Sequence, residues 1–289
     1  MSTADANSFW ARNDFLIRRL HSLSGLIPVG AYMVVHLLVN STVLDSVGAF
    51  QRNVDRIHSL GRFLWVVEWG FIFLPLLFHA IVGVLIIRSG SPNVSSYPLA
   101  KNYRYTLQRV SGMIALFYIG WHVFHMHGWF HNDAWLENVA KPLGGHQFRA
   151  YNAASTAGAA IQHSMLVLLL YAVGIIACVF HLANGLWTMG ITWGIWLSPA
   201  AQRRASVACW IFGLVLGGIG LSALAGMNRV NIEAAREYED QHYKARVAAG
   251  DVTDTPEKRS GSESESTTAS KTESNTESNT ESTTESTAE

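Results

Sequence analysis

Five long stretches of mostly apolar residues alternate with shorter polar segments along this chain. They cover residues 24–44, 64–87, 110–127, 162–187 and 206–227. A helix needs about 18–20 apolar residues to cross a bilayer, and each stretch approaches or exceeds that length, the third being the least hydrophobic. The pattern predicts an all-α, polytopic membrane protein with five transmembrane helices.

The composition outside these stretches predicts where the membrane domain begins and ends. Arg12, Arg18 and Arg19 precede the first stretch, which no small-residue cleavage site follows, so we expect a membrane helix there and not a signal peptide. Residues 1–227 then form one membrane domain. The charged segment 228–249 is expected to add a short surface helix. Residues 250–289 are mostly Ser, Thr and Glu, a composition that predicts a disordered tail.

The distribution of lysine and arginine predicts the orientation in the membrane. These residues concentrate before the first stretch and in the second and fourth connections, at Arg12, Arg18, Arg19, Arg88, Lys101, Arg104, Arg109, Arg203 and Arg204. Basic residues in short segments favour the cytoplasmic side. We therefore expect a cytoplasmic N-terminus and, after five crossings, a C-terminus outside.

The cysteines and the missing motifs limit the chemistry of the chain. Cys178 and Cys209 both lie in apolar stretches and form neither C-x-x-C nor C-x-x-C-H. This excludes a covalently attached c-type haem and argues against an iron–sulfur cluster. Because the chain also has no Rossmann fingerprint, P-loop or Ser/His/Asp arrangement, we expect no site for turnover of an organic substrate in this chain alone, and no nucleic-acid partner.

Four histidines carry the main functional signal. His36, His79, His122 and His181 each lie inside one of the first four apolar stretches, where a polar side chain is costly and usually functional. At about 1.5 Å per residue, and with the N-terminus inside, His36 and His122 fall in the outer half of the membrane and His79 and His181 in the inner half. Two stacked haems, each held by two histidines, require this arrangement, so the first four helices are expected to form a haem-binding bundle.

Residues one helical turn from the histidines add to this interpretation. Gly83 and Gly185 follow the two inner histidines by four residues and share their helix faces, which would give a flat macrocycle room near the backbone. Asn40 follows His36 in the same way and is a candidate to orient a ligand or a quinone.

Several other histidines leave alternatives open. His125 and His127 lie close enough to His122 to compete with it as a ligand. His163 precedes His181 by eighteen residues, or five turns, and is expected to share its face near the outer haem as a contact for a quinone or a propionate. His21 is a candidate contact for a propionate or a partner subunit. The simplest alternative is that the buried histidines only form hydrogen bonds between helices.

Short motifs in a fixed order resemble a known family. They are residues 18–23 (RRLHSL), 73–76 (FLPL), 107–112 (LQRVSG) and 180–187 (FHLANGLW), together with Gly25, Pro28, Gly30, His36, His79, Trp121, His122 and residues 192–194 (TWG). Over residues 9–226 the chain resembles the dihaem cytochrome b anchor subunits of succinate:quinone oxidoreductases, in the form with one large five-helix anchor.

The resemblance implies a complete set of roles. The axial ligands are His36 and His122 for the outer haem b, and His79 and His181 for the inner one. A flavoprotein with covalent FAD and an iron–sulfur subunit dock on the cytoplasmic face of a bacterial membrane. Electrons then pass between the iron–sulfur subunit and menaquinone or ubiquinone. Some dihaem fumarate reductases have a glutamate linked to proton return two residues before the helix-4 ligand, and this chain has Val179 there.

Two other functions fit parts of the pattern. One is the b-haem anchor of another membrane oxidoreductase, such as a formate dehydrogenase or hydrogenase, which the docking partner distinguishes. The other is a haem-free helical transporter, which the lack of internal repeats and midplane charges disfavours.

Overall fold

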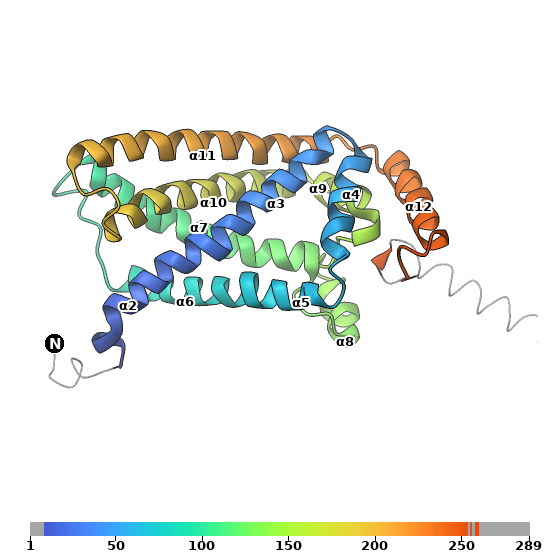
Figure 1. Ribbon diagram of the computed structural model, residues 1–289, viewed down its shortest axis with the longest axis horizontal. Helices are drawn as coiled ribbons and strands as arrows, with labels where there is room; N and C mark the ends of the chain where they lie inside the picture. The colour runs from blue at the N-terminus through green and yellow to red at the C-terminus, as the bar shows by residue number, and fades with distance from the viewer. Residues whose placement is uncertain (1–8, 254, 256–257, 260–289) are drawn as a thin grey trace, which may run out of the picture.

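The computed structural model describes residues 9–253, 255 and 258–259, and these residues form helices joined by turns, with no strand among them (Figure 1). The helices that run along the bundle are α2 (Phe9–Ser24), α3 (Ala31–Ser41), α5 (Phe63–Val67), α6 (Leu74–Arg88), α7 (Ala100–His127), α10 (Met165–Thr192) and α11 (Pro199–Met227). The shorter or peripheral ones are α4 (Val47–His58), α8 (Asp133–Trp135), α9 (Ala153–Gln162) and α12 (Ile232–Ala248).

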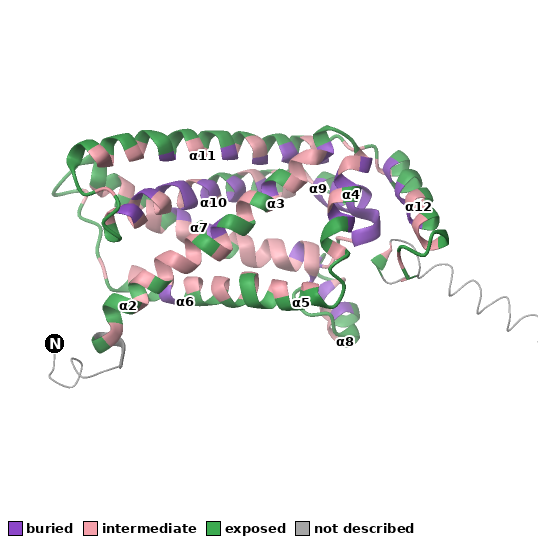
Figure 2. Ribbon diagram, in the orientation of Figure 1, coloured by how far each residue is buried: buried purple, intermediate pink, exposed green. Residues whose placement is uncertain are grey.

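Four helical segments are long and apolar enough to cross a membrane: Arg12–Leu44, Phe63–Arg88, Met165–Thr192 and Pro199–Met227. Large apolar side chains on their outer faces are exposed in the isolated chain. Figure 2 shows exposed residues along α6 and α11. Such a surface suits lipid and not water. Helix α7, which contains the third predicted span, matches the others in length but is more polar and is not among the four.

The long helices run side by side and leave the bundle with two different ends (Figure 1). Helix α10 packs against both α7 and α11, α11 packs on α3, and α2 packs on α6. We call the end that carries α4, α9 and α12 the capped end. The opposite end, where α2 begins and where residues 89–99 and 193–198 lie, is the open end.

Two segments of π-helix interrupt the first two spans. They are η1 (Gly25–Gly30), which contains Pro28, and η3 (Glu68–Phe73), which ends two residues before Pro75 of α6. A proline cannot donate the usual backbone hydrogen bond, and a wider turn accommodates that loss within a membrane helix. The spans therefore remain continuous, and η1 holds Gly25 beside a histidine of the next helix.

The capped end contains two helices that the sequence pattern did not indicate. Helix α4 begins at the N-cap Ser46, whose hydroxyl accepts a hydrogen bond from the Ala49 amide, and it buries Phe50 and Val54. Helix α9 is almost fully buried. Both lie in connections between spans, where hydropathy alone predicts only loops.

Helix α12 occupies the charged segment in which we expected a short surface helix, and it is anchored through a buried carboxylate. Glu239 is fully buried, and its oxygens accept hydrogen bonds from the amides of Ala154 (2.6 Å) and Ser155 (3.2 Å) and from the Ser155 hydroxyl (2.5 Å). These amides are at the start of α9, where a helix favours a negative group. Burial raises the pKa of the Glu239 carboxyl, and these hydrogen bonds act in the opposite direction.

A second buried carboxylate connects α12 to α4. Asp55 accepts hydrogen bonds from His242 (2.9 Å) and Arg246 (2.9 Å) of α12 and from Gln51 (3.0 Å) of its own helix. Gln51 also donates to the Ala150 carbonyl (2.8 Å). These hydrogen bonds join α4, α12 and the segment around Ala150, and the polar groups of each segment find their partners in the others.

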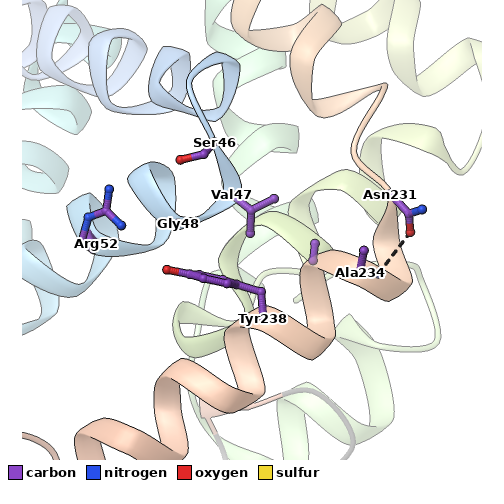
Figure 3. Close-up of a pocket in the computed structure, with 8 residues that line it drawn as sticks. Ser46, Val47, Gly48, Arg52, Asn231, Ala234 and Tyr238 are labelled. Carbon is purple, nitrogen blue, oxygen red and sulfur yellow. Dashed lines mark hydrogen bonds between the residues drawn. The ribbon is translucent and has the colours of Figure 1, made fainter.

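A hollow of about 330 Å³ lies where α12 meets α4 (Figure 3). Tyr238 of α12 reaches across it toward Gly48, at which a Cβ would lie 2.8 Å from the tyrosine ring. Asn231 closes one side, and its side chain accepts the Ala234 amide as the N-cap of α12. The absence of a side chain at Gly48 is therefore part of how α12 docks.

Replacement of Glu239 by alanine is expected to loosen α12 without unfolding the spans. The substitution leaves the start of α9 with unsatisfied buried donors, a loss of about 2–4 kcal/mol. Hydrogen exchange of the α12 amides should accelerate by about 30-fold or more. The control is Glu237→Ala, because Glu237 lies on the exposed face of the same helix. Equal protection in both variants contradicts the anchoring role of Glu239.

The predicted disordered tail falls mostly on residues 260–289, which lie outside the described residues.

Candidate functional site

The structure groups the four span histidines into two pairs. The rings of His36 and His122 have centres 5.9 Å apart, and the rings of His79 and His181 have centres 6.1 Å apart. The first pair joins α3 to α7 toward the capped end, and the second joins α6 to α10 toward the open end. The pairs are the same ones that depth along the predicted spans selects.

The separation within each pair fits one metal ion bound from two sides. A metal–nitrogen bond is about 2 Å and the ring centre lies roughly 1.2 Å behind the nitrogen, so two imidazoles on one metal have centres about 6 Å apart. Among the described residues there is no group of three or more His, Cys, Asp or Glu that could hold a metal ion. Each pair can therefore offer two imidazole ligands to one metal ion.

Backbone carbonyls fix the two rings of the open-end pair. The Nδ1 atom of His79 lies 2.9 Å from the His21 carbonyl, and that of His181 lies 3.0 Å from the Gln108 carbonyl. A carbonyl only accepts, so each Nδ1 carries the proton and each Nε2 keeps a free lone pair. This tautomer is the one that binds a metal through Nε2.

A polar chain supports His181 from the side. The Gln108 amide nitrogen donates to the His181 carbonyl (3.1 Å), its oxygen accepts from Asn184 (2.7 Å), and Asn184 accepts from Arg104 (2.8 Å). The Gln108 nitrogen also lies 3.5 Å from His181 Nε2, at the limit of a hydrogen bond. These contacts tie α7 to α10 at the level of the ligand pair.

Two glycines lie directly against the open-end rings. A Cβ at Gly25 would overlap the His79 ring, and a Cβ at Gly112 would lie 2.8 Å from Cε1 of His181. The glycines predicted to make room for a macrocycle are Gly83 and Gly185. A Cβ at Gly83 would lie 3.2 Å from the His21 ring, and a Cβ at Gly185 would lie 3.4 Å from the amide nitrogen of Gln108. Spacing within one helix cannot predict the first two contacts because each crosses from another helix.

Among the described residues at the open end, two buried side-chain nitrogens lack a hydrogen-bond partner. They are Nε of Arg19, which is a donor, and Nδ1 of His21, which is a donor when it carries the ring proton. The His21 ring stacks on His79 with centres 4.0 Å apart, and the Arg19 guanidinium packs over Phe15 and Trp193. A buried donor usually has an acceptor, and a carboxylate on a group held by His79 would supply one for each of these two atoms.

The capped-end pair has a side-chain partner in place of a carbonyl. His122 Nδ1 lies 3.2 Å from the hydroxyl of Tyr171, which also lies 3.0 Å from Nδ1 of His125. No pattern in the sequence indicates Tyr171, which lies ten residues before His181 on α10 and reaches His122 through packing of α7 on α10.

The two histidines expected to compete with His122 lie elsewhere. His125 stacks on Trp121 with ring centres 4.9 Å apart, and His127 lies beside His131, with centres 4.2 Å apart. His122 is the histidine of α7 whose ring lies beside His36.

The structure changes the expectation for His163 and sharpens that for Asn40. Helix α10 begins at Met165 with Ser164 as its N-cap, so the exposed His163 lies before the helix and the prediction that it shares a helix face with His181 is wrong. Asn40 donates to the His36 carbonyl (2.7 Å) within its own helix. The Asn40 side chain therefore contacts its own helix one turn from His36.

One comparison with known proteins decides the family. No family model matches the chain. The succinate dehydrogenase cytochrome b558 subunit of Bacillus subtilis (strain 168) is 35% identical over 211 residues, which cover 73% of this chain and 96% of that protein. This chain belongs to the family of succinate dehydrogenase cytochrome b subunits. About a quarter of its length lies outside the shared region.

Proposed function

We propose that the chain anchors a succinate dehydrogenase or fumarate reductase in the membrane and passes electrons between its iron–sulfur subunit and a quinone through two b-type haems. The observation that carries this proposal is the presence of two histidine pairs toward opposite ends of one apolar bundle, each with the separation that a shared iron requires. Membership of the family of succinate dehydrogenase cytochrome b subunits supports the same function.

The residues around the open-end pair fit a haem. Gly25 and Gly112 let other helices approach the two rings closely, and the unpartnered donors of Arg19 and His21 match the carboxylates that haem b carries. Bound haem b supplies one-electron carriers at two depths of the bilayer. The chain's own part is to present Nε2 of each histidine, to fix its tautomer and to exclude water.

We propose that α7 also crosses the membrane, which together with the four apolar segments makes five membrane helices. It is 28 residues long, lies against α10 and supplies one member of a histidine pair. The basic residues of the open end then lie in the cytoplasm, in accord with the bias of short segments. This orientation makes His79 and His181 the inner pair and His36 and His122 the outer pair, and it places the C-terminus outside in a bacterial cytoplasmic membrane.

The open end is the proposed docking face for the catalytic subunits. It faces the cytoplasm, and its basic side chains suit a flavoprotein with covalent FAD together with an iron–sulfur subunit. Succinate or fumarate reacts on the flavoprotein, so this chain needs no substrate site of its own. The quinone, menaquinone or ubiquinone, is proposed to bind near the outer pair, with Asn40 and His163 as candidate contacts.

The test is purification of the chain in mild detergent from its own membranes. We expect a flavoprotein and an iron–sulfur protein to copurify, and addition of succinate to reduce b-type haem in the sample. A molybdenum or nickel subunit in their place, or haem that dithionite reduces and succinate does not, would overturn the assignment to succinate dehydrogenase.

A further inference from the structure

The Nδ1 atoms of three of the proposed ligands, His79, His181 and His122, are held in two different ways. His79 and His181 face main-chain carbonyls, at 2.9 and 3.0 Å. His122 instead faces the hydroxyl of Tyr171, at 3.2 Å. Nδ1 of His181 also lies 3.4 Å from the Ser111 hydroxyl, but its shorter contact is the Gln108 carbonyl. At His122 the contact is a side chain, so a substitution there changes the acceptor without moving a helix.

The direction of the hydrogen bonds around Tyr171 follows from the chemistry of the groups. A histidine that binds a metal through Nε2 carries its proton on Nδ1, so His122 donates to the Tyr171 oxygen. The tyrosine then has its own hydrogen to donate, and Nδ1 of His125 lies 3.0 Å away as the acceptor. The result is a one-way chain from His122 through Tyr171 to His125.

Packing holds this chain in place. Tyr171 is 5% exposed and contacts the rings of Tyr118 and Trp121, with centres 5.8 and 5.2 Å away. Trp121 in turn stacks on His125 at 4.9 Å. A hydroxyl that is buried and donates onward is a better acceptor than a solvated one, because successive hydrogen bonds polarise each other.

We infer that Tyr171 is a positioning residue that orients His122 and lowers the midpoint potential of the outer haem. This inference rests on the proposed function, since it assigns His122 as an axial ligand. A hydrogen bond accepted from Nδ1 makes the imidazole a more electron-rich ligand, which favours the oxidised iron. His125 serves as the terminal acceptor of this chain and not as a ligand.

The experiment is a redox titration of the two haems in the purified complex carrying Tyr171→Phe, followed by optical and electron paramagnetic resonance spectra. We expect both haems to be retained, the outer haem to titrate at a higher potential with an altered low-spin signal, and the inner haem to be unchanged. The matched control is Tyr118→Phe, because Tyr118 also contacts His122, through ring stacking with centres 5.7 Å apart. It should leave both potentials in place.

A second variant covers the case in which Tyr171→Phe loses the outer haem. His125→Leu keeps the tyrosine oxygen but removes its acceptor, and it should raise the outer potential above the wild-type value in a complex that retains both haems. Unchanged outer potentials and spectra in both variants would overturn the inference while leaving the proposed function intact. If His122→Ala retains both haems, the proposed function itself fails.

Discussion

Alanine at His79 or at His181 is expected to remove the same haem, and alanine at His36 or at His122 to remove the other one. The rings within each pair are about 6 Å apart, at 6.1 and 5.9 Å, as two ligands on one iron require. Under the proposed function, loss of either ligand would leave the iron with one bond to the protein. Haem content should therefore fall from two to one per chain in each single variant.

The measurement is haem content per chain together with the spectrum of the haem that remains. The variants of His79 and His181 should share one residual spectrum, and those of His36 and His122 should share a different one. His131→Ala is the control, because this exposed histidine is also on the capped side but outside both pairs. Variants of His79 and His36 that lose the same haem would contradict the pairing.

Alanine at Gly25 or Gly112 is expected to impair the inner haem as strongly as a ligand change. The added methyl group would meet the ring of His79 in the first case and lie 2.8 Å from the ring of His181 in the second. Overpacking of this kind costs about 1–3 kcal/mol, and both rings are held by hydrogen bonds that limit how far they can yield. We expect occupancy of the inner haem to fall about tenfold, with the outer haem unchanged.

Gly218→Ala provides the comparison, since a Cβ at Gly218 of α11 meets no atom within 4 Å. It should keep both haems at wild-type content. The same spectrum is expected for the residual haem of Gly25→Ala, Gly112→Ala, His79→Ala and His181→Ala. Full inner-haem content in both glycine variants would mean that the close approach of these helices to the rings is not needed for binding.

Hydropathy and position along each span predicted much of the fold, because a helix needs a minimum number of apolar residues to cross a membrane. The four strongest predicted stretches coincide with the four apolar helices, and the rise per residue placed the histidines at two depths. The helices α4 and α9 were missed because they bury small or amphipathic faces outside the bilayer, where hydropathy carries no signal. The prediction for His163 was wrong because α10 begins only after its N-cap Ser164, so His163 and His181 do not lie on one continuous helix.

The contacts that hold the histidine rings could not be predicted from residue spacing along the sequence. Gly25 touches a ring on another helix 54 residues away, and Tyr171 reaches His122 across the contact of α10 with α7. Such contacts depend on how helices rotate and cross, which one sequence does not encode in a local pattern. The family motifs contain Gly25 and Gly112, but only the packing assigns them to the inner pair.

The most direct measurement of the central claim is the number of haem b groups per chain in the purified wild-type protein, from a pyridine haemochrome assay and a quantitative amino-acid analysis. Two histidine pairs at two depths predict two haems per chain, with two distinct midpoint potentials. A value of one or none, in protein that retains its catalytic partners, would contradict the dihaem account.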